Sequence, residues 1–141
     1  MKRAIGFFVC MVLIFELGAI ILGYSSAYKL GYGAISIMGM IIAATFLWLW
    51  WVRATPLALG MAFSWAGSGT VMGWWWSYNI LGSPEAMHDN KALFVFLSLY
   101  IVGAVMHFKV IQQALSLPRN IFWVPVGGAM LLSVLAWRWA G

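Results

Sequence analysis

Long, continuous apolar runs separated by short polar segments dominate the chain. A helix needs roughly 20 apolar residues to cross the hydrocarbon core of a bilayer, and an isolated strand cannot cross it at all. The runs are continuous rather than alternating, which favours helices over barrel strands. The pattern therefore predicts about five membrane-spanning helices, over residues 4–24, 33–51, 56–78, 92–112 and 121–139.

Short connections constrain how these helices follow one another. The stretch 25–32, rich in Ser, Gly and Tyr, is expected to form a turn, and residues 52–55 are too few to separate the second and third helices. Those two helices are therefore predicted to be antiparallel neighbours. Pro56 suits the first turn of the third helix, where a missing N–H costs nothing. The longest polar stretch is 82–91.

Composition strengthens the membrane interpretation. Apolar residues make up 65% of the chain and charged residues 8%, whereas soluble proteins carry about 25% charged residues. So few charged side chains cannot cover a water-facing surface, so lipid must be the solvent. The net charge of +5 does not indicate nucleic acid, because the basic residues are scattered singly at segment ends. We expect a single all-α transmembrane domain over residues 1–141.

The basic residues predict an orientation. The side of the bundle with more Lys and Arg is normally cytoplasmic. One side is expected to hold Lys2, Arg3, Arg53, Lys109 and Arg119, and the other Lys29, Lys91 and Arg138. This five-to-three excess predicts a multi-pass protein of the inner (cytoplasmic) membrane, with the N-terminus in the cytoplasm and the C-terminus outside.

Tryptophans gather at the expected helix ends. Such clusters are typical of the interfacial aromatic belt of membrane proteins, and they comprise Trp48, Trp50, Trp51, Trp74, Trp75, Trp76, Trp137 and Trp139. Trp65 differs, because it lies near the middle of the third expected helix. Two interpretations are open for Trp65: an aromatic wall that faces a bound cation, or ordinary packing within the bundle.

Glu16 is the central candidate for chemistry. It lies two residues past the midpoint of the first expected helix, about 3 Å from the helix centre at a rise of 1.5 Å per residue. A carboxylate at that depth is costly and by default indicates function. The group is expected to hold either a proton or a cation, which would make it a coupling site. The alternative is a protonated Glu that hydrogen-bonds a neighbouring helix.

Small residues recur on two of the helices. Ala19 and Gly23 follow Glu16 on the first, and Gly67, Gly69 and Gly73 lie on the third. Such stripes let helices approach closely. We interpret them as packing or gating positions, and tight packing within one chain, a substrate passage and a dimer seam all remain open.

The chain shows no pattern of a metal, cofactor or catalytic site. Cys10 has no possible partner, and His88 and His107 lie 19 residues apart, about 28 Å along a continuous helix. Haem ligation by both is therefore not expected, and His107 is interpreted as a polar residue of the bundle. We predict neither an enzyme nor a bound metal or cofactor.

The same residues resemble those of a known family. An early Glu, a Pro that opens the third helix, and a Trp-x-Gly-x-Gly stretch are shared with the small multidrug resistance transporters of the drug/metabolite transporter superfamily. Here they are Glu16, Pro56 and Trp65-Ala66-Gly67-Ser68-Gly69, and a Leu81-Gly82 pair follows at a matching offset. The resemblance covers about residues 4–110.

Some features depart from the pattern of that family. Tyr24 stands where the family usually has a Lys, and Ala62 stands where a tyrosine often faces the substrate. The polar stretch 82–91 is longer than expected, and the helix over 121–139 is additional. The resemblance therefore implies a four-helix transporter-like bundle plus one extra helix.

The resemblance also implies an activity. It predicts a small proton-coupled exchanger of cationic or amphipathic small molecules or lipid-linked metabolites. A homodimer would bring two copies of Glu16 into one chamber, Trp65 would stack on the substrate, and the glycines of the third helix would permit alternating access.

Two other functions compete with exchange. One is an accessory or anchor subunit of a larger membrane complex, in which Glu16 would bond to a partner subunit. The other is a membrane-embedded enzyme, or a haem or quinone site. The partners expected are membrane lipid, a second copy or other membrane subunits, and a small-molecule substrate, but not nucleic acid.

Overall fold

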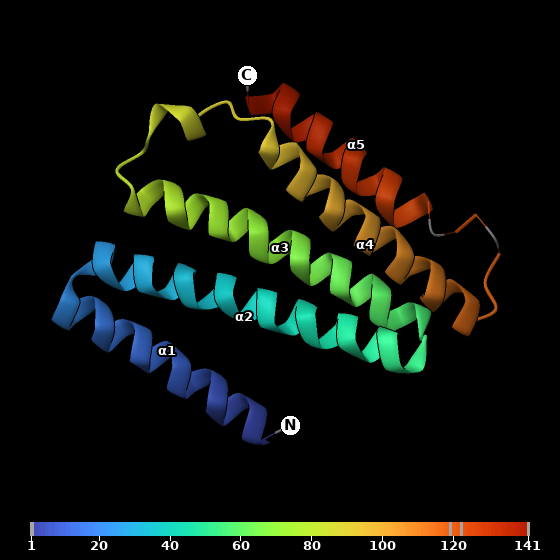
Figure 1. The fold of residues 1–141 in the computed structure, drawn as a ribbon, viewed down its shortest axis with the longest axis horizontal. Helices are drawn as coiled ribbons and strands as arrows, with labels where there is room; N and C mark the ends of the chain where they lie inside the picture. Colours follow the sequence, from blue (N-terminus) through green and yellow to red (C-terminus); the bar gives the residue numbers. More distant parts are fainter. Residues whose placement is uncertain (1, 119, 122, 141) are drawn as a thin grey trace.

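The computed structural model describes residues 2–118, 120–121 and 123–140, and Figure 1 shows their arrangement. Within these residues the chain forms five α-helices and one 3-10 helix. They are α1 (Lys2–Leu22), α2 (Tyr24–Arg53), α3 (Pro56–Ile80), η1 (Glu85–Met87), α4 (Ala92–Ala114) and α5 (Trp123–Ala140). The predicted all-α fold with five helices is confirmed.

A single glycine turns the chain between α1 and α2. Gly23 has φ 81° and ψ 149°, a conformation open in practice to glycine alone. The N–H of Ala27 donates to the carbonyl of Gly23 at 3.1 Å, so the hydrogen bonding of α2 starts directly at the turn residue. The turn expected over 25–32 is therefore not formed. Because one residue reverses the chain, that stretch is helical, and α2 begins at Tyr24 rather than at residue 33.

The connection between α2 and α3 is as short as predicted. Ala54 adopts a left-handed conformation (φ 51°, ψ 30°), and its N–H donates to the carbonyl of Trp50 at 2.6 Å. Thr55 is extended, and Pro56 begins α3. The two helices pack along each other as antiparallel neighbours, which confirms the prediction made from the short connection.

The polar stretch between α3 and α4 carries η1. Gly82 (φ 76°) and Ser83 (φ 61°) turn the chain beyond α3. α4 then begins at Ala92, where the hydropathy pattern places it. α5 begins at Trp123, slightly later than expected. Ile121, the expected first residue of the last helix, lies in a turn.

The core is a layer of three helices with α3 in the middle. α2 and α4 flank α3 on opposite sides (Figure 1). On the α2 side, the buried Ser36 hydroxyl donates to the Gly69 carbonyl at 2.8 Å. A Cβ added at Gly39 would lie 3.1 Å from Gly69 Cα. The two backbones therefore run in direct contact, which is how small residues join helices in lipid.

The α4 side of α3 is packed as closely. A Cβ added at Gly67 would overlap the backbone nitrogen of Tyr100, and one added at Gly103 would overlap the backbone nitrogen of Ser64. Farther along the same seam, a Cβ at Gly60 would lie 3.2 Å from the His107 nitrogen. Glycine is required at Gly67 and Gly103 because a backbone cannot move aside as a side chain can.

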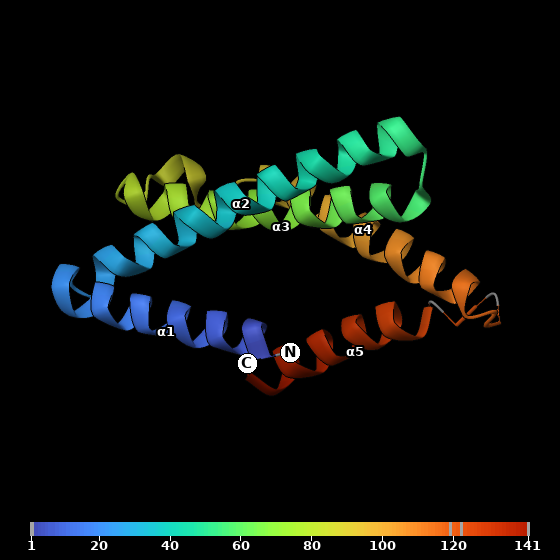
Figure 2. The same ribbon diagram turned by 90° about the horizontal axis from the view of Figure 1, so that it is seen from below.

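α1 and α5 lie outside this layer. Figure 2 shows both helices diverging from the plane of the other three. Among the described residues, α1 packs chiefly against α2, and α5 packs substantially against no other helix. Large apolar side chains on both are exposed, among them Phe7, Ile20, Leu132 and Trp137. Lipid or another protein chain must cover these surfaces.

Three helical segments of the described chain are long and apolar enough to cross a membrane. They are Arg3–Leu22, Tyr24–Arg53 and Glu85–Ala114, so the chain is a multi-pass membrane protein. α3 falls short on hydropathy because glycine, serine and tryptophan occupy many of its positions. α5 is only 18 residues long and carries Arg138 in its last turn.

The structure bears on part of the predicted charge bias. Arg53 ends α2 and Lys109 lies near the end of α4, so both are at the end of the layer opposite η1. Lys29 and Lys91 lie at the η1 end. Arg119 lies outside the described residues, and which end faces the cytoplasm stays a prediction.

The close contact between α3 and α4 predicts that one added methyl group lowers the free energy of unfolding substantially. Gly67→Ala should lower the free energy of unfolding by about 1–3 kcal/mol, because the added carbon meets the backbone of Tyr100. The matched control is Gly128→Ala on α5, where nothing lies within 4 Å of an added Cβ. Urea titration in detergent, followed by circular dichroism, measures both. Equal stability of the two variants would contradict the close α3–α4 contact.

Candidate functional site

Glu16 lies on the peripheral helix α1 and lines a hollow between α1 and α2. It is four residues past Val12, the midpoint of α1, or about 6 Å along the axis. The hollow has a volume of about 370 Å³. It is lined by residues from α1 and from the first three turns of α2, namely Phe15, Glu16, Ala19, Tyr24, Ala27, Tyr28, Gly31, Tyr32 and Ile35.

Three tyrosines form one wall of this hollow. Tyr24, Tyr28 and Tyr32 are spaced four residues apart on α2, which aligns them on one face of the helix. The ring centroids of Tyr24 and Tyr28 are 6.2 Å apart, and those of Tyr28 and Tyr32 are 4.3 Å apart. We call these three residues the tyrosine ladder.

Two contacts at glycines hold α1 against α2. A Cβ added at Gly18 would lie 3.9 Å from Ala27 Cβ, in ordinary van der Waals contact. A Cβ added at Gly31 would lie 2.7 Å from Phe15 Cε1, so the Phe15 ring occupies the space that a side chain at position 31 would fill. Together with the tight turn at Gly23, these contacts fix which face of α1 lies against α2, and this places Glu16 at the hollow.

Glu16 has no ion-pair partner within the described chain. Among residues 2–118, 120–121 and 123–140, no Lys, Arg or His forms an ion pair with Glu16. Lys29 is the nearest basic residue along α2 but does not line the hollow. A carboxylate beside aromatic rings is the arrangement that binds organic cations, because the rings attract positive charge and the carboxylate neutralises it. The geometry therefore suits a proton or a monovalent organic cation.

Trp65 is not part of this hollow. It lies on α3, 37% exposed, and its backbone carbonyl faces the α2 seam near Gly39. α1 packs on α2 rather than on α3. Within the described residues, Trp65 and Glu16 of one chain therefore do not line the same cavity.

The other predicted positions are distributed over the helices. Ala19 lines the Glu16 hollow, whereas Gly23, which was expected on a helix face, forms the turn after α1. Gly69 and Gly73 contact α2 at Met40 and Ser36, and Gly67 contacts α4. His107 is partly buried on α4, with its backbone against Gly60.

The described residues contain no evident metal site. Within them, no three His, Cys, Asp or Glu side chains come together closely enough to hold an ion. Cys10 is exposed on α1.

The tyrosine ladder was missed from the sequence. Its residues fall in the stretch 25–32, or beside it, that was interpreted as a turn, and a turn gives no reason to place them on one face. The signal was present in the spacing, since Tyr24, Tyr28 and Tyr32 recur every four residues. Treating that stretch as helix would have placed all three opposite the end of α1.

Comparison with known proteins adds no relationship. The chain matches no protein-family model, and searches of curated proteins and of solved structures find no significantly similar protein. The resemblance to the small multidrug resistance transporters therefore stays a prediction from a few residues.

The hollow predicts a specific role for the ring at position 28. Tyr28→Leu should weaken binding of tetraphenylphosphonium by about 5- to 30-fold, equivalent to about 1–2 kcal/mol for a lost cation–π contact. Tyr28→Phe is the matched control, because it keeps the ring and removes only the hydroxyl. Equilibrium dialysis in detergent measures both. Equal weakening by the two substitutions would show that the hydroxyl, and not the ring face, is responsible.

Proposed function

We propose that this protein is a small proton-coupled exchanger of cationic or amphipathic small molecules or lipid-linked metabolites. Glu16 is the shared site of the proton and the substrate. The observation that carries the proposal is the hollow in which Glu16, without an ion-pair partner among the described residues, lies beside three tyrosine rings.

A carboxylate at this depth supports exchange better than simple binding. A negative charge inside the hydrocarbon region is costly, so Glu16 is most stable when neutralised. Either a proton or an organic cation neutralises it, and the two exclude each other at one carboxylate. Arrival of a cation therefore releases a proton, and arrival of a proton releases the cation. That competition is the elementary step of an exchanger.

The tyrosine ladder supports a route to this carboxylate. From Tyr24 to Tyr32 the ladder spans about 12 Å along α2, at 1.5 Å per residue. It starts beside the α1–α2 turn, and all three of its residues line the Glu16 hollow. Tyrosine suits such a path, because its ring attracts cations while its hydroxyl remains hydrated near the membrane surface.

The packing of the layer supports five crossings. α3 contacts α2 on one side and α4 on the other along its length, and both neighbours are apolar enough to span. A helix between two spanning helices shares their depth. We propose that α5 crosses the membrane as well. We also propose that the protein lies in an inner membrane with its N-terminus in the cytoplasm.

Oligomers fit this proposal. α1 covers only one of its faces with α2 and exposes the others. A second copy packed there would bring two Glu16 hollows together, as the family resemblance implies. Trp65, also partly exposed, could then line the shared chamber across the interface.

Transport in liposomes tests the role of Glu16. In wild type, adding an organic cation such as tetraphenylphosphonium or ethidium to one side should drive protons in the opposite direction, which a pH-sensitive dye inside the liposomes records. Glu16→Gln keeps the shape of the side chain but cannot exchange its proton. We expect it to reduce the proton flux by at least about tenfold, equivalent to about 1.4 kcal/mol.

Glu85→Gln is the matched control, because Glu85 is an exposed carboxylate on η1 and does not line the Glu16 hollow. Its proton flux should equal that of wild type. Proton fluxes of equal size in wild type and Glu16→Gln would contradict the proposal. So would silence of folded wild type toward a broad panel of cations.

One observation favours a second candidate, an accessory subunit of a larger complex. α5 packs substantially against no other described helix, and an added Cβ would meet nothing within 4 Å at Gly127 or Gly128. Small residues facing open space are where another helix could dock. On this account Glu16 would hydrogen-bond a partner subunit.

Purification from its native membrane at natural abundance distinguishes the two candidates. An exchanger should elute as a single homo-oligomer after mild detergent extraction. An accessory subunit should elute together with one or more other chains in fixed ratio, and deleting α5 should release them.

A further inference from the structure

A second hollow lies beneath the connection between α3 and α4. Figure 1 shows that this connection is at the same end of the bundle as the α1–α2 turn. The hollow has a volume of about 290 Å³, at the small end of the range of about 300–1,000 Å³ for ligand sites. Its aromatic wall consists of Trp74, Trp75, Tyr78 and Phe94, and His88 and Asp89 lie on its polar side. We call these four aromatic residues the aromatic corner.

Two pairs of rings that line the hollow are set at steep angles, one within the aromatic corner and one between the corner and His88. Trp75 and Tyr78 have centroids 5.7 Å apart and planes at 85°. The Tyr78 and His88 rings are 6.4 Å apart at 52°. A cation is attracted to a ring face when it lies within about 6 Å of the centroid. Rings at steep angles give one bound cation access to more than one face, as in the cages that recognise quaternary ammonium groups.

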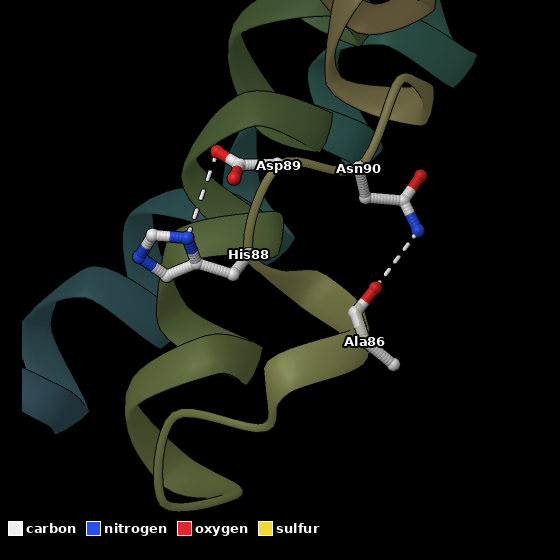
Figure 3. A network of polar contacts seen from close by, with 4 residues as sticks. All are labelled: Ala86, His88, Asp89 and Asn90. Carbon is white, nitrogen blue, oxygen red and sulfur yellow. Dashed lines mark hydrogen bonds and ion pairs between the residues drawn. The ribbon is translucent and has the colours of Figure 1, made fainter.

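The connection above the corner is held in place by Asn90. Its side-chain N–H donates to the Ala86 carbonyl at 3.0 Å, and its side-chain oxygen accepts from the Ala92 N–H at 2.9 Å. Figure 3 shows Asn90 reaching toward Ala86, while the side chains of His88 and Asp89 meet on the other side. Asn90 thereby ties η1 to the start of α4 and fixes the roof of the hollow.

Charge on this roof favours a cation. Asp89 is fully exposed, and its Oδ1 lies 3.6 Å from His88 Nδ1. Glu85 lines an adjoining hollow that shares His88 and Asp89. Lys91 follows directly in sequence but lines neither hollow. Carboxylates at the rim therefore attract positive charge toward the rings.

The chemistry of the walls favours one type of cation. A primary ammonium carries three N–H donors that need acceptors, and beside the Asp89 carboxylate the walls of the hollow offer chiefly ring faces and apolar side chains. Both polar atoms of the Asn90 side chain are already engaged. A quaternary ammonium has no N–H, so burial against rings leaves nothing unsatisfied. Anchoring at the membrane surface explains why tryptophans occur near a helix end. It does not explain a hollow in which tryptophan rings lie beside a carboxylate.

We propose that the aromatic corner and Asp89 form a binding site for a quaternary ammonium group, presented by a free organic cation or by a choline-type lipid headgroup. The site is separate from the Glu16 hollow and does not rest on the proposed exchange. A protein without transport activity would still bind at the corner, so failure of one proposal leaves the other intact.

Ligand-observed NMR with tetramethylammonium tests the site. The experiments use the full chain in a maltoside detergent and in the Glu16→Gln background, so the Glu16 hollow contributes no carboxylate. Saturating the aromatic protons of the protein should transfer signal to the methyl protons of the bound cation. The test variants are Trp75→Leu and Asp89→Asn. The control is Trp137→Leu, which removes a 75%-exposed tryptophan from α5.

We expect each test variant to lower the affinity at least about fivefold and the control to leave it unchanged. Asp89→Asn alters a fully exposed side chain, so it keeps the fold, which circular dichroism verifies. Transfer that survives either test substitution at full strength would overturn the proposal. So would absence of transfer from the Glu16→Gln protein itself.

A competition arm separates the two sources of the ammonium group. Short-chain phosphatidylcholine is added to the tetramethylammonium complex, with short-chain phosphatidylglycerol as the control. Displacement by phosphatidylcholine alone assigns the site to a lipid headgroup. Retention of tetramethylammonium in the presence of both lipids assigns it to a free cation.

Discussion

Close backbone contact along both sides of α3 is the constraint on which the rest of the structure depends. In lipid, apolar surface gains little from leaving its solvent, so helices associate through packing and hydrogen bonds. Gly39 and Gly69 bring α2 and α3 together, and Gly67 and Gly103 do the same for α3 and α4. The result is a fixed layer. The hollow of about 300 Å³ that residues of α2, α3 and α4 line is walled by apolar side chains alone.

The acidic side chains of both candidate sites lie at the edge of the layer. Glu16 lies on α1, which contacts α2 through only a few small residues, and the hollow beside it opens where the helix packing loosens. The aromatic corner lies at another edge, where η1 bridges α3 and α4. Both hollows combine aromatic rings with an acidic side chain, and both are at the same end of the bundle (Figure 1). An organic cation at that membrane surface would meet both.

Sequence patterns predicted the helices well where hydropathy alone decides. The start of α4, the short α2–α3 connection and the place of Pro56 all follow from local rules. The start of α2 did not, because Ser, Gly and Tyr are common in turns, and nothing local indicates that Gly23 alone reverses the chain. The position of α1 could not be predicted either, since it depends on which small residues of α1 and α2 come into contact. That is why Glu16 was singled out from its depth, whereas the tyrosines around it were missed although their four-residue spacing is visible in the sequence.

Proton release on cation binding tests the central claim most directly. Purified protein in weakly buffered detergent solution is mixed with tetraphenylphosphonium at several starting pH values while the pH is recorded. If one carboxylate serves both ligands, wild type should release about one proton per bound cation, and Glu16→Gln should release none. Cation binding to wild type without proton release, or equal release from both proteins, would contradict a shared site at Glu16.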